Sequence, residues 1–214
     1  MYNTEKRESA LLVLAKEPSE RWSLEDLSSE FRSLVNSAGI EIVEVFDFNL
    51  KIPTPAYYIG KGKLYELLDF IEDNEVSVVI FNNNLTFTQQ RNLEGILGRK
   101  TIDRTQLILD IFAKHAHSQE GILQVELAQL EYLLPRLRGK GIELSRQAGG
   151  IGTLGPGEKK LEVDRRKISN RIHRLKQELR VIKKHHSVMR KKRQKHQERT
   201  YSLVGYTSAG KTTL

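Results

Sequence analysis

The chain has 214 residues, of which 38% are hydrophobic, enough for a sizeable core in one large domain or two small ones. It contains no cysteine, which excludes disulfides, thiol catalysis and cysteine metal sites. No segment approaches the roughly 18 consecutive apolar residues that a membrane span needs, and the charged N-terminus lacks the apolar stretch of a secretory signal. We therefore expect a cytoplasmic protein without an integral membrane segment.

The formal net charge of +8 is unevenly distributed. Residues 1–157 hold 17 Lys and Arg against 22 Asp and Glu, whereas residues 158–200 hold 17 against 5. A cationic segment on an acidic body predicts a polyanionic partner, either nucleic acid or an anionic membrane surface, so peripheral membrane association stays open. The alternative reading is a solvated helix face that binds nothing.

Residues 10–103 alternate short apolar runs with amphipathic stretches, a pattern typical of an α/β layer with mostly parallel strands. The pattern predicts strands at 10–15, 40–46 and 76–81 and a further edge strand at 99–103. Helices are predicted to begin near Ser23, Lys61 and Thr86, and Thr86-Phe87-Thr88-Gln89 has the form of a capping box. Asn82, Asn83 and Asn84 follow the third strand, where helix capping is favoured over a ligand site.

Residues 104–138 have the heptad seam of one long helix, which Pro135 is expected to bend or end. The seam consists of Leu109, Ala113, Ala116, Leu123, Leu127, Leu130, Leu134 and Leu137. Nearly the same steps recur at Leu161, Ile168, Ile172, Leu175, Leu179, Ile182, His186 and Met189. Two long helices with matching seams predict an antiparallel hairpin; packing of both seams onto the α/β layer is the alternative.

The segment 139–157 should form the hairpin tip and keep little regular structure, because it holds seven glycines and one proline. Its pattern Gly150-Ile151-Gly152-Thr153-Leu154-Gly155 resembles a dinucleotide fingerprint, but no strand leads into it. Cations lie among or beside the glycines and are candidates for RNA contact: Arg136, Arg138, Lys140, Arg146, Lys159 and Lys160. A flexible connector is the plainer reading.

A phosphate-binding loop follows the apolar strand pattern Tyr201-Ser202-Leu203-Val204. Its residues are Gly205, Tyr206, Thr207, Ser208, Ala209, Gly210, Lys211 and Thr212, and Thr213 comes next. Glycines let backbone N–H groups surround a pyrophosphate, Lys211 meets the outer phosphates, and the Thr212 hydroxyl can ligate Mg²⁺. The histidines are not spaced as a metal site, and no catalytic set of side chains stands out.

Several long strings spread over nearly the whole chain form a further pattern. The strings in the first half are Tyr58-Ile59-Gly60-Lys61-Gly62-Lys63, Gln90-Arg91-Asn92-Leu93 and Asp103-Arg104-Thr105-Gln106-Leu107-Ile108-Leu109-Asp110-Ile111-Phe112-Ala113. Those in the second half are Gln124-Val125-Glu126-Leu127-Ala128-Gln129-Leu130, Gly149-Gly150-Ile151-Gly152, Gly155-Pro156-Gly157-Glu158, Asp164-Arg165-Arg166 and Leu203-Val204-Gly205-Tyr206-Thr207.

These strings resemble the HflX family of translation-associated GTPases. This resemblance implies an α/β fold with a mostly parallel sheet, then a long antiparallel two-helix hairpin, then the first strand and phosphate loop of an incomplete Ras-like G domain. The corresponding domain ranges are 1–103, 104–199 and 200–214. The implied function is that of a ribosome-associated GTPase that docks its hairpin on the rRNA of the large ribosomal subunit and helps to split or rescue stalled ribosomes. GTP is the implied substrate, with Mg²⁺ at Thr212, and a monomer is expected.

The sequence departs from the family pattern after Leu214, since the switch threonine, the second Mg²⁺-site motif and the guanine-selecting motif are absent. We therefore expect no catalytic residues and little GTPase activity in these 214 residues alone. Two other functions stay open. One is a nonenzymatic module that docks on RNA or the ribosome, and the other is a hairpin used only for protein contacts.

Overall fold

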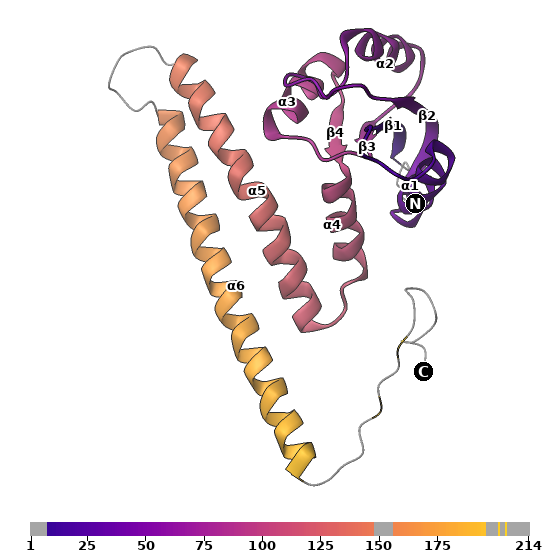
Figure 1. The fold of residues 1–214 in the computed structure, drawn as a ribbon. Helices are drawn as coiled ribbons and strands as arrows, with labels where there is room; N and C mark the ends of the chain where they lie inside the picture. The colour runs from indigo at the N-terminus through magenta and orange to yellow at the C-terminus, as the bar shows by residue number, and fades with distance from the viewer. Residues whose placement is uncertain (1–7, 148–155, 196–200, 202–203, 205–214) are drawn as a thin grey trace, which may run out of the picture. The chain divides into compact units, whose positions relative to one another are not determined.

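The computed structural model describes residues 8–147, 156–195, 201 and 204, and it divides into two compact units, residues 1–175 and 176–214. Strands and helices alternate in its first part and long helices follow (Figure 1). The elements are β1 (Ser9–Lys16), α1 (Leu24–Ser37), β2 (Glu41–Asn49), α2 (Lys61–Asp73), β3 (Val78–Phe81), α3 (Phe87–Leu97), β4 (Lys100–Asp103), α4 (Arg104–His115), α5 (Gln119–Gln147) and α6 (Pro156–Lys195).

The four strands form one parallel sheet in the order β2-β1-β3-β4. Ala10 in the central strand β1 pairs with Ile42 on one side and with Val78 on the other. The four predicted strands are therefore confirmed, and β4 is an edge strand as expected. The strand order reverses beside β1, the kind of point at which parallel sheets commonly bind ligands at their carboxyl edge.

Helices cover both faces of the sheet, and each inner strand is accordingly apolar on both sides. In β1, Leu11 and Val13 belong to the core under α2 and α3, whereas Leu12 and Leu14 belong to the core under α1 and α4. Alternate residues of a strand point to opposite faces, so a continuous apolar run is what a doubly covered parallel strand requires.

Helix starts follow the polar residues that the sequence suggested. Ser23 caps α1 by accepting a hydrogen bond from the Asp26 amide, and Thr86 with Gln89 forms the predicted capping box of α3. Gly98 ends α3 in the left-handed conformation with φ of 59°, which glycine adopts without steric cost. These caps fix the lengths of the helices that cover the sheet.

The prediction of a single helix over residues 104–138 is wrong, because α4 ends at His115 and α5 begins at Gln119. Ala116 is extended, and the Ser118 side chain accepts a hydrogen bond from the Gly121 amide, which starts the new helix. Within α4 the buried residues are Leu107 and Ile111, which pack on the sheet. The predicted seam positions on this helix are not its core, since Ala113 is exposed.

The glycine-rich segment is shorter than expected, because α5 continues to Gln147 and α6 begins at Pro156. Pro135 lies inside α5 and does not end it. Arg136, the next residue, is held by hydrogen bonds to Leu85, Gln90 and Asp103, and these anchor the turn that the proline would otherwise weaken. Residues 139–147 and 156–157 of the predicted loop are therefore helical, and residues 148–155 lie outside the described residues.

Candidate functional site at the helical hairpin

The predicted site residues fall on two parts of the chain. The phosphate loop, Gly205 to Thr213, lies outside the described residues, and so does the dinucleotide-like stretch 150–155. The predicted RNA contacts Arg138, Lys140 and Arg146 lie on the last turns of α5, and Lys159 and Lys160 on the first turn of α6. Only their helical backbone is described, so their role as RNA contacts stays a prediction.

The two long helices pair through the first half of α6. Arg171 donates two hydrogen bonds of 2.7 Å each to the Glu126 carboxylate of α5, in the fork geometry that suits guanidinium and carboxylate. Ile172 and Leu175 of the second predicted seam are buried, as is Leu123 of the first. The paired parts of α5 and α6 run antiparallel, as Figure 1 shows and as the seams predicted.

The ion pair between Glu126 and Arg171 should contribute modestly to hairpin stability. The bonds from Arg171 lower the pKa of Glu126, so this contribution is present above the ordinary carboxyl pKa and is lost as pH falls through the lowered value. Both side chains are about a third or more exposed, at 43% for Arg171 and 35% for Glu126. In a double-mutant cycle of Glu126→Gln and Arg171→Gln, we expect a coupling of about 0.5–1 kcal/mol at pH 7 in thermal unfolding. A coupling near zero would show that the pair does not join the helices.

Helix α6 carries the segregated positive charge found in the sequence. It holds sixteen Lys and Arg residues against four Asp and Glu. The basic side chains toward its end are exposed, namely Lys183, Lys184, Arg190, Lys191, Lys192 and Arg193. The seam does not continue as a buried stripe here, since His186 is exposed and Met189 is 44% exposed. This end of α6 is a long, exposed, cationic surface.

Arg136 corrects one sequence interpretation, which grouped it with the cations predicted at the hairpin tip. Its guanidinium forms an ion pair with Asp103, at 3.1 Å between Nη2 and Oδ2, and the two side chains are only 15% and 1% exposed. It also donates to the Leu85 carbonyl and lies 3.3 Å from the centre of the Tyr132 ring. Arg136 therefore joins α5 to the carboxyl edge of the sheet.

Asp103 is the partner that the sequence analysis missed. Its carboxylate accepts hydrogen bonds from the Gln106 and Leu85 amides as well as from Arg136. Three donors satisfy the hydrogen-bonding needs of this buried carboxylate. The sequence did hold one signal for the position of Asp103. An aspartate at a strand end, three residues before Gln106, has the spacing of a helix N-cap, and Asp103 caps α4.

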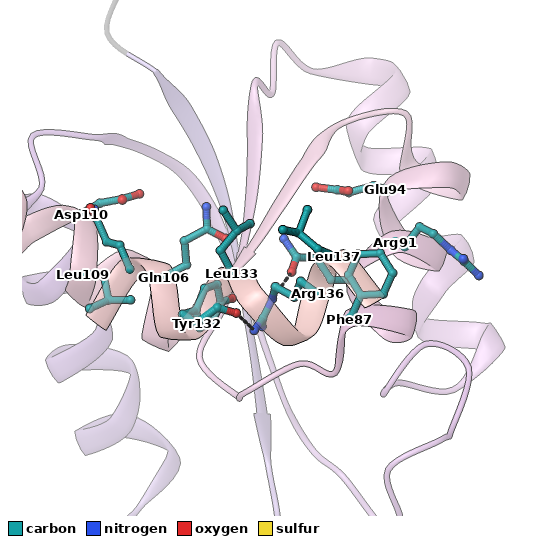
Figure 2. Close-up of a pocket in the computed structure, with 12 residues that line it drawn as sticks. Phe87, Arg91, Glu94, Gln106, Leu109, Asp110, Tyr132, Leu133, Arg136 and Leu137 are labelled. Atoms are coloured by element: carbon teal, nitrogen blue, oxygen red, sulfur yellow. Dashed lines mark hydrogen bonds between the residues drawn. The ribbon is translucent and has the colours of Figure 1, made fainter. Parts of the chain in front are cut away.

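A cavity of about 390 Å³ lies next to this junction, between α3, α4 and α5 (Figure 2). Apolar side chains from all three helices line it, and polar groups stand among them. The Tyr132 hydroxyl is buried and has no hydrogen-bond partner within the described residues. Burial, with the nearby charge of Asp103, raises the pKa of Tyr132, so this hydroxyl stays protonated.

The three asparagines at the carboxyl edge do not cap α3, so the favoured prediction was wrong. Asn83 bonds both the amide and the carbonyl of Ala15, and it thereby ties β3 to β1. Asn82 accepts a hydrogen bond from Arg104, which also pairs with Glu30. The amide oxygen of Asn84 accepts a hydrogen bond from the Thr105 hydroxyl of α4, and Thr86 already occupies the cap position of α3.

The described ranges hold no helix with both the length and the apolar character needed to cross a membrane.

Comparisons with known proteins match this chain along most of its length. The family model described as GTP-binding GTPase N-terminal matches residues 25–113, and the one described as GTP-binding GTPase Middle Region matches residues 115–193. GTPase HflX of Caldanaerobacter subterraneus is 50% identical over 210 residues, covering 98% of this chain and 48% of that protein. GTPase HflX of Escherichia coli is 48% identical over 191 residues, covering 89% of this chain and 45% of that protein.

A solved structure also resembles this chain. It is a GTP-binding protein of the archaeon Sulfolobus solfataricus in complex with GDP, with a TM-score of 0.57 and 26% sequence identity, and the match covers 82% of this chain and 46% of that one. The chain thus spans about half the length of the curated relatives it matches.

Proposed function

Because this chain belongs to the HflX family of GTPases, we propose that it supplies the ribosome-docking part and the first nucleotide-binding loop of a cytoplasmic GTPase. The described hairpin docks on the rRNA of the large ribosomal subunit, and GTP binding and hydrolysis control that docking. The biological outcome is the splitting or rescue of stalled ribosomes. The domain ranges 1–103, 104–199 and 200–214 and a monomeric state are part of the same proposal.

The charge on α6 supports this proposal most directly. Sixteen cations against four anions on one 40-residue helix form a surface suited to a phosphate backbone. An α-helix rises about 1.5 Å per residue, so α6 is roughly 60 Å long and can follow an RNA groove over several nucleotides. Phosphate contacts position such a surface without reading base sequence.

Two observations support the nucleotide part of the proposal: the sequence of the loop, and the similarity to relatives that are GTPases. Gly205 to Thr213 would surround the GTP phosphates, with Lys211 on the outer phosphates. Thr212 would hold Mg²⁺, which neutralises phosphate charge when bound. The Sulfolobus relative was crystallised with GDP, which favours a guanine nucleotide here.

A nonenzymatic RNA-docking module is the second candidate, because phosphate contact by the exposed cations of α6 needs no nucleotide. The two functions differ in whether nucleotide changes RNA affinity. If GTP and GDP leave ribosome binding unchanged in a protein extended to the length of the relatives, the docking module is favoured.

Lys211→Ala should weaken GTP binding by more than about tenfold in a protein extended to the length of the relatives, since it removes a charge-assisted contact to phosphate. Fluorescence titration with a labelled GTP analogue measures this effect. Lys191→Ala removes the same charge from α6 and should leave GTP affinity unchanged. Equal affinity of the Lys211 variant and the parent protein would contradict the role given to Lys211.

A further inference from the structure

The cavity between α3, α4 and α5 has no part in the proposed docking or nucleotide binding. Its apolar lining is Phe87, Leu109, Leu133 and Leu137, and the Leu133 side chain is 41% exposed. A volume of about 390 Å³ lies within the usual range of small-ligand sites. A hollow with an exposed leucine in it gains free energy when an apolar group fills it.

Several polar groups of this cavity have unused hydrogen-bonding capacity within the described part of the chain. The Asp110 carboxylate accepts no hydrogen bond there, and Glu94 uses only Oε1, which accepts from the Thr101 amide at 3.2 Å. The side-chain amides of Gln106 and Gln129 and the Tyr132 hydroxyl are likewise unpartnered. The carboxylates can only accept, so the cavity favours a ligand that donates hydrogen bonds.

Arg91 and Arg136, the cations that line the cavity, are already in contact with other groups of the chain. Arg136 is held by Asp103, Gln90 and two carbonyls, and Figure 2 shows its bond to the Tyr132 carbonyl. Arg91 lies over the Phe87 ring at 5.9 Å. Lys100 and Lys114 act on Asp110 from outside the lining and only partly offset the burial that raises its pKa. Within the described part of the chain, neither the Asp110 nor the Glu94 carboxylate is in an ion pair.

We propose that this cavity binds a linear aliphatic polyamine. Its ammonium groups donate to the Asp110 and Glu94 carboxylates, which come from α4 and α3 and lie on opposite sides of Leu133 and Leu137 in Figure 2. Its methylene chain covers Leu133 and Leu137 of α5. Charge-assisted hydrogen bonds at both ends and apolar contact between them match the chemistry of such a ligand.

A ligand in this position touches the helices of the sheet layer and α5 at once. Because it binds the folded chain, it should also raise the unfolding temperature by linkage. The proposal does not depend on the docking or nucleotide functions, since its residues belong to neither.

Isothermal titration calorimetry on the 214-residue chain tests this proposal with two probes of the same length, hexane-1,6-diamine and hexane-1,6-diol. We expect the diamine to bind and the diol to bind at least about tenfold more weakly, because only the diamine carries charge. Asp110→Asn with Glu94→Gln should reduce diamine affinity by at least about tenfold. Glu41→Gln with Asp69→Asn, two exposed sites, makes the same net charge change and should leave affinity unchanged.

Three results would overturn the proposal: no heat of binding for the diamine, equal binding of diamine and diol, or equal losses in the two double variants. The last result would mean general attraction of a polycation to the acidic part of the chain. Thermal unfolding of each variant confirms that it is folded. The comparison of the two probes on the unaltered chain needs no variant at all.

Discussion

Replacing Arg136 by Met should lower the free energy of unfolding by about 3–5 kcal/mol, because it leaves the Asp103 carboxylate buried without its cation. For a chain of this size the unfolding midpoint should fall by about 6–20 °C. The substitution also removes the bonds that join α5 to Leu85 and Gln90. Differential scanning calorimetry at pH 7 measures the change.

An exposed ion pair supplies the matched control. Lys63→Met removes the same charge from a pair with Glu66 in which the side chains are 42% and 51% exposed, and it should cost less than about 1 kcal/mol. Adding Asp103→Leu to Arg136→Met removes the orphaned carboxylate and should restore part of the loss. An Arg136 variant no less stable than the Lys63 variant would show that the junction does not hold α5 to the sheet.

The second large effect concerns RNA. Changing Arg190, Lys191, Lys192 and Arg193 to Gln should weaken binding to large ribosomal subunits by about two to three orders of magnitude near 0.1 M salt. Each lost phosphate contact means that fewer counterions are released from the RNA on binding, and this release favours the complex. These side chains are exposed, so the folded chain should keep its stability. Co-sedimentation at several protein concentrations measures the affinity.

The control variant neutralises four exposed cations outside the hairpin, Arg21, Arg32, Lys51 and Lys61. It has the same net charge as the α6 variant, and its affinity should fall far less. Equal losses in both variants would mean that net charge, rather than the α6 surface, determines ribosome binding.

Local sequence patterns predicted the sheet layer well. The apolar run of β1 and the capping box at Thr86 each depend on neighbouring residues alone, and the structure confirms both. The break between α4 and α5 was missed because apolar residues continue on helical steps across it. The small cap at Ser118 is a weaker signal than that periodicity.

Tertiary contacts explain the remaining errors. Glycines and Pro135 favoured an early end to α5, yet contacts of Arg136 with distant residues hold that turn. The same contacts moved Arg136 from a predicted tip cation to a buried junction. No spacing in the sequence links Arg136 to Asp103, so neither residue could be assigned to the junction from sequence alone.

The salt dependence of ribosome binding tests the central claim most directly, because phosphate contact is what the cationic hairpin is proposed to make. Co-sedimentation of the 214-residue chain with large ribosomal subunits, measured from 50 to 300 mM salt, gives the slope of log affinity against log salt concentration. We predict a steep negative slope that becomes shallower by about 3 in the α6 variant with four fewer cations. An affinity that does not change with salt concentration, or a slope in that variant equal to the slope of the unaltered chain, would contradict the account.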